Sequence, residues 1–107
     1  MNTATEIFEN WKGTLAANAE KAKEINAIYQ FNLNGDGGGS WIVDLTTASV
    51  REGKEAAQCT VTMASSDFVD MVAGRMQGQQ LFMMGKLLIE GDMGLALRLQ
   101  QVFEAAR

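Results

Sequence analysis

This chain of 107 residues has carboxylates that could act as acids or bases, but it has no histidine to activate a nucleophile. Histidine, the commonest general base in enzymes, is absent, and no Gly-x-Ser-x-Gly motif offers a nucleophile. The carboxylates that lie close together in the sequence are Asp67 with Asp70, Glu90 with Asp92, and Glu52 with Glu55. A solvated helix cap or a surface pair explains each of them better than acid–base catalysis. The residues therefore predict a protein that is not an enzyme.

The single cysteine, Cys59, has no partner for chemistry elsewhere in the sequence. It cannot form an internal disulfide or a zinc cluster, and without a histidine it lacks an activating base. We expect a small buried apolar residue, in a chain that fits a reducing compartment. A calcium site needs about six oxygen ligands from a spaced loop, and no Asp-rich loop of that form is present. The sequence therefore predicts neither a metal site nor a cofactor.

The charge and the terminal segments limit the expected partners and location. Nine Lys and Arg against thirteen Asp and Glu give a formal charge of −4, which disfavours nucleic acid as a partner. No apolar stretch approaches the ~20 residues that span a bilayer. Residues 1–6 lack the pattern of a secretory signal, and residues 105–107 do not match a peroxisomal signal. We expect a cytoplasmic protein.

Methionine is the unusual residue of this chain. Seven are present, and Met71, Met76, Met83 and Met84 fall within fourteen residues. Methionine side chains are unbranched and polarisable, so they adapt to apolar partners of varied shape. Composition leaves two interpretations open, a loosely filled core or an adaptable apolar binding site.

The elements that must position these residues begin with an amphipathic helix. Thr3 and Glu6 have the spacing of a capping box. Apolar residues then recur at three- and four-residue steps, in a stripe that continues to residue 25: Phe8, Trp11, Leu15, Ala19 and Ala22. The pattern predicts one helix that docks on a sheet.

Alternating apolar residues then predict strands. Residues 29–33 and 40–46 flank a glycine-rich turn, which favours a β-hairpin over a phosphate-binding loop because no helix follows the glycines. Residues 47–55 predict a short edge strand and a loop. Residues 58–63 predict a further strand with one apolar face.

The second half of the chain combines short helices with one strand. A helix is expected to start at residues 65–67, with a serine hydroxyl as N-cap. Residues 79–84 predict a short helix, and residues 86–90 predict the final strand. Asp92 is expected to cap a last helix that starts at Met93. That helix carries two apolar stripes, so we expect its second face to meet protein, a partner or a ligand.

Several segments together carry a family likeness. Residues 62–68 read Thr-Met-Ala-Ser-Ser-Asp-Phe, and residues 85–99 read Gly-Lys-Leu-Leu-Ile-Glu-Gly-Asp-Met-Gly-Leu-Ala-Leu-Arg-Leu. Residues 29–33 and 41–45 extend the likeness upstream. In this order, over residues 8–103, the segments resemble the sterol carrier protein 2 family.

The resemblance implies an α+β fold in which a five-stranded, mostly antiparallel sheet is covered by helices and encloses an apolar tunnel. It also implies a single lipid-binding domain over residues 1–107, for fatty acids, fatty acyl-CoA, sterols or phospholipids. By position, the implied ligand-binding residues of the tunnel are Phe31, Leu33, Trp41, Val43, Phe68, Met71, Val72, Met76, Leu81, Phe82, Met84, Leu95, Leu99, Gln100 and Phe103. Gln100 matches a family position where a polar side chain meets the polar end of the ligand.

We therefore predict a non-catalytic lipid-binding and lipid-transfer domain, driven by the burial of an acyl chain or ring system. Its expected partners are a lipid ligand and, transiently, a membrane or an enzyme, with the domain itself a monomer or a weak dimer. The alternative is a protein–protein accessory or dimerisation module with a filled core. The two predictions differ in whether the interior is hollow.

Overall fold

This computed structural model describes residues 3–106, in which two helices precede four strands, and two further pairs of helices flank a fifth strand. Met1, Asn2 and Arg107, which belong to the terminal segments considered above, lie outside the described residues. The strands are β1 (Ile28–Asn34), β2 (Gly39–Asp44), β3 (Ser49–Glu52), β4 (Cys59–Ala64) and β5 (Leu87–Gly91). The helices are α1 (Ala4–Ala17), α2 (Ala19–Ile25), α3 (Ser65–Val72), α4 (Gly78–Met83), α5 (Met93–Ala96) and α6 (Leu99–Ala105).

The strands form one five-stranded sheet in the order β3-β2-β1-β4-β5. β1 pairs antiparallel with β2 and parallel with β4, while the pairs β2–β3 and β4–β5 are antiparallel. The expected mostly antiparallel sheet is therefore confirmed, with a single parallel pair at its centre.

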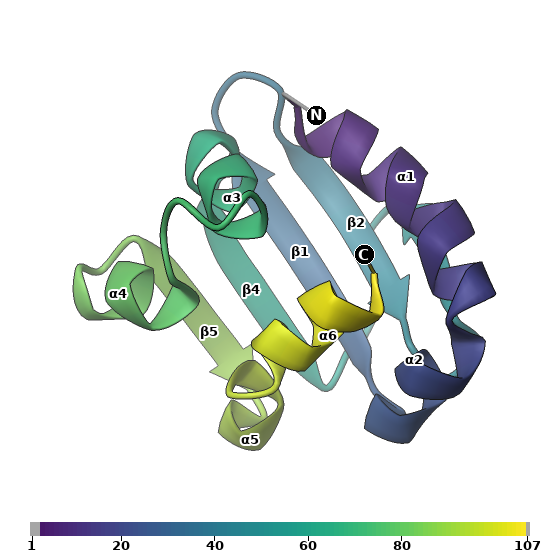
Figure 1. Cartoon of the computed structure of the whole chain (residues 1–107). Helices are drawn as coiled ribbons and strands as arrows, with labels where there is room; N and C mark the ends of the chain where they lie inside the picture. Colours follow the sequence, from purple (N-terminus) through teal and green to yellow (C-terminus); the bar gives the residue numbers. More distant parts are fainter. Residues whose placement is uncertain (1–2, 107) are drawn as a thin grey trace.

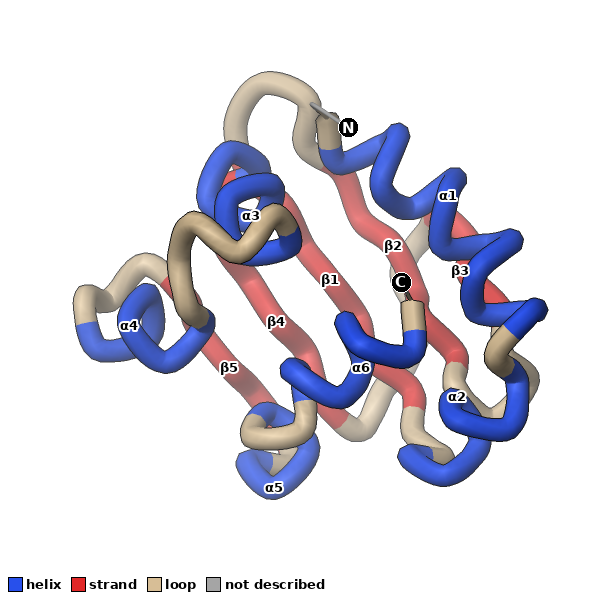
Figure 2. The backbone as a smooth tube through the Cα atoms, viewed as in Figure 1, coloured by secondary structure: helices blue, strands red, loops and turns tan. Residues whose placement is uncertain are grey.

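One face of the sheet is covered by helices. α1, α3 and α6 lie over this face, and α4 and α5 lie near opposite ends of β5 (Figures 1 and 2). α1 crosses the side of β2 and β3, whereas α3 and α6 lie over the central strands. The predicted α+β arrangement is confirmed.

The N-terminal helix begins as predicted and ends earlier. The Thr3 hydroxyl accepts a hydrogen bond from the Glu6 N–H at 3.2 Å and donates to the Glu6 carboxylate at 3.1 Å. Asn18 leaves the helical region (φ −113°, ψ 36°), and its side-chain amide donates to the Thr14 carbonyl at 3.1 Å. Such a local side-chain bond competes with the helix. The predicted continuous helix to residue 25 is therefore two helices, α1 and α2.

The predicted N-cap of α3 is wrong. The capping position is occupied by Ala64, and Ser65 lies inside the first turn. The Ser65 hydroxyl instead donates to the Asp36 carbonyl at 2.6 Å. Because β4 runs directly into α3, no residue is left between them to serve as a side-chain cap.

The predicted last helix is interrupted. Asp92 caps α5 as predicted, because its Oδ1 accepts hydrogen bonds from the N–H groups of Gly94 at 2.8 Å and Leu95 at 3.3 Å. Arg98 then leaves regular helix geometry (φ −93°, ψ 4°), and α6 begins after it. The break divides the predicted stripe between Leu95 and Leu99, and Leu97 of the other stripe is 86% exposed.

Aromatic rings fill the space between α1 and the sheet. Phe8 stacks on Trp41 with ring centroids 4.8 Å apart and on Phe68 at 5.0 Å. Trp11 meets Phe8 edge-on at 5.3 Å, and Phe31 meets Phe68 at 5.6 Å. These rings are at most 3% exposed, so this part of the interior is solid. Such pairs contribute roughly 0.5–1.5 kcal/mol each beyond their area burial.

The outer face of the sheet, opposite the helices, is partly covered by the segment between β3 and β4. Gln30, which is 3% exposed, donates from Nε2 to the Gly53 carbonyl at 3.0 Å. Its Oε1 accepts a hydrogen bond from the Glu55 N–H at 2.9 Å. This buried amide thus anchors the segment against β1.

An ion-pair cluster completes the outer face. Arg51 lies 3.4 Å from the Asp44 carboxylate and 2.7 Å from that of Glu55. Burial by itself raises the pKa of Asp44. Hydrogen bonds from Thr46, Arg51 and Thr47 outweigh burial, so the pKa of this carboxyl lies below its usual value.

Candidate functional site

A cavity of about 810 Å³ lies at the β5 side of the molecule, beyond the aromatic core. Ligand pockets commonly measure about 300–1,000 Å³, so this cavity has the size of a binding site. Its wall is built by β5, by parts of α3 to α6, and by the link between α3 and α4. The lining residues are Met71, Val72, Gly74, Met76, Gln77, Gly78, Gln79, Phe82, Met83, Leu87, Ile89, Met93, Ala96, Leu97, Leu99, Gln100 and Phe103.

β5 supplies the floor of the cavity. Successive strand residues point to opposite faces, and Leu87 and Ile89 reach the cavity while Leu88 and Glu90 do not. Leu87 is 1% exposed and belongs to the buried core, whereas Leu88 is 59% exposed. A floor of two aliphatic side chains offers a ligand apolar surface and no hydrogen bond.

The walls formed by α3 and α4 depend on glycine and on a folded link. Gly74 follows α3 with φ +84°, a conformation that favours glycine. The Arg75 N–H then donates to the Asp70 carbonyl at 2.9 Å, and the Arg75 side chain pairs with the Asp70 carboxylate at 2.8 Å. A Cβ at Gly78 would lie 3.3 Å from Met71 Sδ, so glycine there allows α4 to approach α3 closely.

The opposite wall is formed by α5 and α6. Leu99 and Phe103 are each 7% exposed. The ring of Phe103 packs beside that of Trp11 in the aromatic core, with the ring centroids 5.8 Å apart. The Tyr29 hydroxyl donates to the Leu95 carbonyl at 2.6 Å, which fixes α5 to β1. Burial raises the pKa of Tyr29, so the phenol remains a donor at neutral pH.

The cavity lining carries no charge. Its described residues include no Asp, Glu, Lys, Arg, Ser, Thr, Tyr or Cys. The polar side chains in the lining are the exposed amides of Gln77, Gln79 and Gln100. Amides donate and accept hydrogen bonds but do not transfer protons at neutral pH. The cavity can therefore bury an apolar body and hydrogen-bond a polar end, and its wall offers no acid, base or nucleophile.

The structure brings part of the predicted ligand-binding set to this cavity. The predicted residues found in its wall are Met71, Val72, Met76, Phe82, Leu99, Gln100 and Phe103. The predicted residues found in the packed core are Phe31, Leu33, Trp41, Val43, Phe68 and Leu81. Leu95 is half-buried against that core, and Met84 is 53% exposed at the end of α4.

Other wall residues were not predicted from the sequence. They are Gly74, Gln77, Gly78, Gln79, Met83, Leu87, Ile89, Met93, Ala96 and Leu97. A signal existed for some of them, because strand alternation places Leu87 and Ile89 on one face and the second apolar stripe contains Met93 and Leu97. No sequence signal marked the amides of Gln77 and Gln79.

Groups outside the cavity offer little chemistry. Cys59 is buried in β4, as predicted, and burial together with the nearby Asp92 charge raises the pKa of its thiol to about 11. Over residues 3–106, no three His, Cys, Asp or Glu side chains are grouped so as to hold a metal ion. None of the helices in the same described part is both long enough and apolar enough to cross a membrane.

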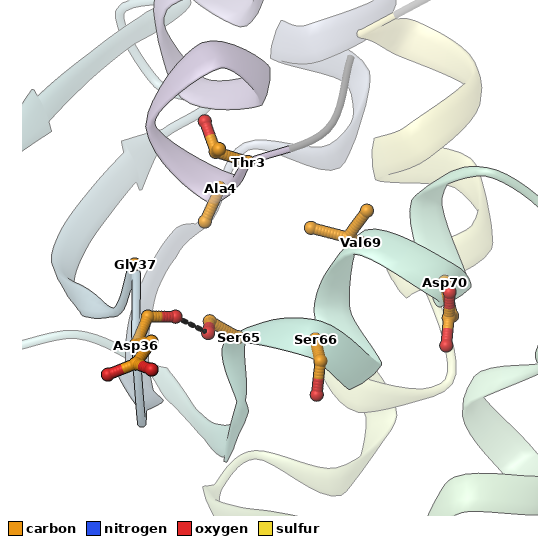
Figure 3. Close-up of a pocket in the computed structure, with 8 residues that line it drawn as sticks. All are labelled: Thr3, Ala4, Asp36, Gly37, Ser65, Ser66, Val69 and Asp70. Atoms are coloured by element: carbon orange, nitrogen blue, oxygen red, sulfur yellow. Dashed lines mark hydrogen bonds between the residues drawn. The ribbon is translucent and has the colours of Figure 1, made fainter.

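A second pocket, of about 250 Å³, lies where the starts of α1 and α3 meet the turn between β1 and β2 (Figure 3). Two of its polar groups are already engaged. The Ser65 hydroxyl donates to the Asp36 carbonyl, and the Asp70 carboxylate pairs with Arg75. It is also smaller than the ~300 Å³ at which ligand pockets begin. The larger cavity is therefore the candidate site.

Comparison with known protein families agrees with this fold. A family model described as the SCP-2 sterol transfer family matches residues 8–104. The chain belongs to this family. The resemblance read from the sequence motifs is thereby confirmed.

Relatives of this SCP-2 family chain are longer proteins. "Hydroxysteroid dehydrogenase-like protein 2" of Xenopus laevis is 42% identical over 104 residues, which cover 92% of this chain and 25% of that protein. "Peroxisomal multifunctional enzyme A" of Dictyostelium discoideum is 36% identical over 110 residues, which cover 97% of this chain and 25% of that protein. The chain thus spans about a quarter of the length of these curated relatives.

Solved structures of the SCP-2 family share the fold. The apo form of sterol carrier protein 2 from Yarrowia lipolytica has a TM-score of 0.83 and 30% identity, covering 94% of this chain and 88% of that chain. A solution structure of palmitated SCP2L2 from Aedes aegypti has a TM-score of 0.78 and 25% identity, covering 94% of each chain. The palmitated Aedes protein thus has the same fold as this chain.

Proposed function

We propose that this SCP-2 family chain is a lipid-binding domain that holds a fatty acyl chain, or a lipid of similar size, in the cavity beside β5 and assists its transfer. The observation that carries the proposal is the uncharged, largely apolar cavity of about 810 Å³. The palmitated Aedes relative supports the same ligand class. Such a volume does not fit the filled core of the alternative, a protein–protein accessory module.

Apolar burial provides enough free energy for this role. At about 0.8 kcal/mol per methylene, roughly twelve buried methylenes contribute about 10 kcal/mol gross. Immobilising the ligand opposes this by at least about 4 kcal/mol. Micromolar affinity therefore needs no charged contact. Because apolar burial is not directional, broad selectivity among acyl chains and sterols follows.

The polar end of the ligand is placed at the open side of the cavity. The amides of Gln77, Gln79 and Gln100 are exposed lining groups, whereas the floor residues Leu87 and Ile89 are aliphatic. A buried polar group without a partner is unfavourable. The chain of the ligand therefore points toward β5, and its head group points toward the amides and solvent.

The domain holds its ligand and leaves any chemistry to another site. The cavity wall has no acid, base or nucleophile among its described residues. The matching region of the curated relatives is about a quarter of chains that are named as enzymes. We infer that the cavity stores or presents a lipid to a membrane or to an enzyme.

A titration with a fluorescent fatty acid tests the proposal. We expect saturation near one ligand per chain with an affinity in the micromolar range. A folded protein that shows no saturable binding, as judged with near-ultraviolet circular dichroism as the folding control, would overturn it. A protein that fails to bind and instead forms a dimer in light scattering would favour the accessory module.

A matched pair of substitutions locates the bound ligand. Ala96→Trp adds a bulky ring at the cavity wall, and Ala16→Trp adds the same ring on an exposed position of α1. We expect Ala96→Trp to weaken fatty-acid affinity by about tenfold, since loss of a few buried methylenes is enough for that change. Ala16→Trp should bind as the unaltered protein does. Equal affinities of the two variants would place the ligand elsewhere.

A further inference from the structure

Methionine is the commonest residue in the wall of the cavity. The chain contains seven methionines, and four of the six in residues 3–106 belong to the lining. These four are Met71, Met76, Met83 and Met93. The same lining includes no Cys, Tyr or Trp among its described residues. Its thioethers are therefore the side chains of the wall that a mild oxidant can change.

Exposure separates these four sulfurs. Met83 is 79% exposed and Met93 is 50% exposed, whereas Met71 is 5% exposed and Met76 is half-buried. A dissolved oxidant reacts only with a sulfur that it can reach, and methionine sulfoxide is the common product. Met83 and Met93 are therefore the cavity methionines that react first.

The two exposed methionines border the cavity from two separate helices. Met83 is the last residue of α4, and Met93 is the first residue of α5. Figure 1 places these helices near opposite ends of β5. Neither methionine is part of the buried core in the described residues. A polar group on both side chains thus changes two sides of the cavity and leaves the aromatic core in place.

The single cysteine does not compete for the oxidant. Cys59 is buried in β4, and burial together with the nearby Asp92 charge raises the pKa of its thiol to about 11. The thiolate is the reactive form of cysteine, so a protonated and buried thiol is inert at neutral pH. An oxidant in solution therefore reacts with the exposed methionines before it reacts with Cys59.

We propose that Met83 and Met93 form an oxidation site through which hydrogen peroxide lowers the affinity of the cavity for its lipid. The proposal rests on the proposed function and adds a regulation of the same cavity. In the reaction, a lone pair of Sδ attacks one peroxide oxygen and the O–O bond breaks. The sulfur keeps that oxygen as a sulfoxide, and the other oxygen leaves with both hydrogens as water. The sulfur is oxidised by two electrons, and the peroxide is reduced by the same two electrons.

The sulfoxides weaken lipid binding because they are polar. Oxidation converts a flexible apolar side chain into one that carries a strong hydrogen-bond acceptor. In the free protein, water reaches this oxygen at Met83 and Met93, which are both exposed. An acyl chain that covers the oxygen removes the water and supplies no donor in return, which is unfavourable. Reduction of the sulfoxide restores the thioether, so the change is reversible.

Fatty-acid titration before and after peroxide treatment tests the oxidation site. Peptide mass mapping identifies which methionines have gained an oxygen. We expect the treated protein to bind about tenfold more weakly, and methionine sulfoxide reductases for both epimers should restore its affinity. In Met83→Leu/Met93→Leu, peroxide should change the affinity by less than about twofold, because leucine has no sulfur. In Met84→Leu, which removes an exposed methionine outside the lining, peroxide should weaken binding as much as in the unaltered protein.

The outcomes separate this inference from the proposed function. If fatty acid binds equally well before and after both sulfoxides have formed, the inference is wrong and the proposed function stands. The same conclusion follows if peroxide weakens binding to Met83→Leu/Met93→Leu as much as to the unaltered protein. A loss of the near-ultraviolet circular dichroism signal on oxidation would also overturn the inference, since the effect would then be unfolding. No saturable binding before peroxide would overturn the proposed function, and the inference with it.

Discussion

The sheet of this protein is covered in two different ways. Under α1, the ring of Phe8 stacks on Trp41 and on Phe68, with centroids 4.8 and 5.0 Å apart, and the interior there is solid. Beside β5, short helices interrupted by glycine enclose a cavity of about 810 Å³. One long helix can place its side chains against a sheet at every turn, whereas short helices with a folded link between them meet it only in places.

The two regions differ in their contribution: the region under α1 stabilises the fold, and the region beside β5 offers a cavity for a ligand. Burial of large aromatic side chains is the dominant source of stability in a small domain. The solid region therefore maintains the sheet on which the hollow region is built. The hollow region exposes apolar side chains, such as Leu97 at 86%, that stability alone does not require.

The largest expected effect is on the stability of the solid region. Phe8→Ala should lower the free energy of unfolding by about 3–5 kcal/mol, because it removes a fully buried ring and leaves a cavity. Phe82→Ala, at a ring that is 45% exposed beside the cavity, should lower it by less than about 1 kcal/mol. Urea unfolding followed by circular dichroism measures both. Similar losses in the two variants would contradict the comparison.

A ligand should stabilise the protein through the hollow region alone. At a free fatty-acid concentration of about 100 times the dissociation constant, the free energy of unfolding should rise by about 2.7 kcal/mol. Ala96→Trp should lose most of this gain, whereas Ala16→Trp should keep it, because only the first side chain occupies the cavity. Urea unfolding of each variant with and without fatty acid is the measurement. The same gain in both variants would argue that the ligand binds outside the cavity.

A smaller loss in the free energy of unfolding is expected when Asp44, on the outer face of the sheet, is substituted. The pKa of Asp44 is lowered in the folded protein, so its stabilising contribution is present above the unfolded pKa and is lost as pH falls through the folded pKa. Asp44→Asn should cost about 1 kcal/mol at pH 7. The difference from the unaltered protein should shrink in acid.

Unfolding free energies at neutral and acidic pH test the Asp44 prediction. Glu104→Gln, on an exposed position of α6, is the control for loss of one negative charge. A difference between Asp44→Asn and the unaltered protein that stays constant down to acidic pH would show that the carboxylate does not contribute in this way.

Much of the fold could be predicted from local patterns. The glycine-rich hairpin, the edge strand and the caps at Thr3 and Asp92 each depend on residues adjacent in the sequence. The breaks at Asn18 and Arg98 were not predicted, because the apolar stripes continue through them. The missing cap of α3 also followed from tertiary contacts, since Ser65 bonds to the distant Asp36.

The residues of the candidate site could likewise be predicted only in part from the sequence. Met71, Phe82 and Leu99 were predicted for the site and lie in the cavity wall. Phe31 and Trp41 were predicted for the same site but lie in the core, where α1 supplies Phe8 against them. The alternation of a strand specifies which face a side chain occupies, but not which helix will cover it.

The sequence by itself determined the family, the strand periods and an apolar side for each element, because these depend on the order of neighbouring residues. Only the tertiary structure decided where the interior is filled and where it is empty. That outcome depends on the distance between elements far apart in the chain, and on whether their side chains are large enough to span it.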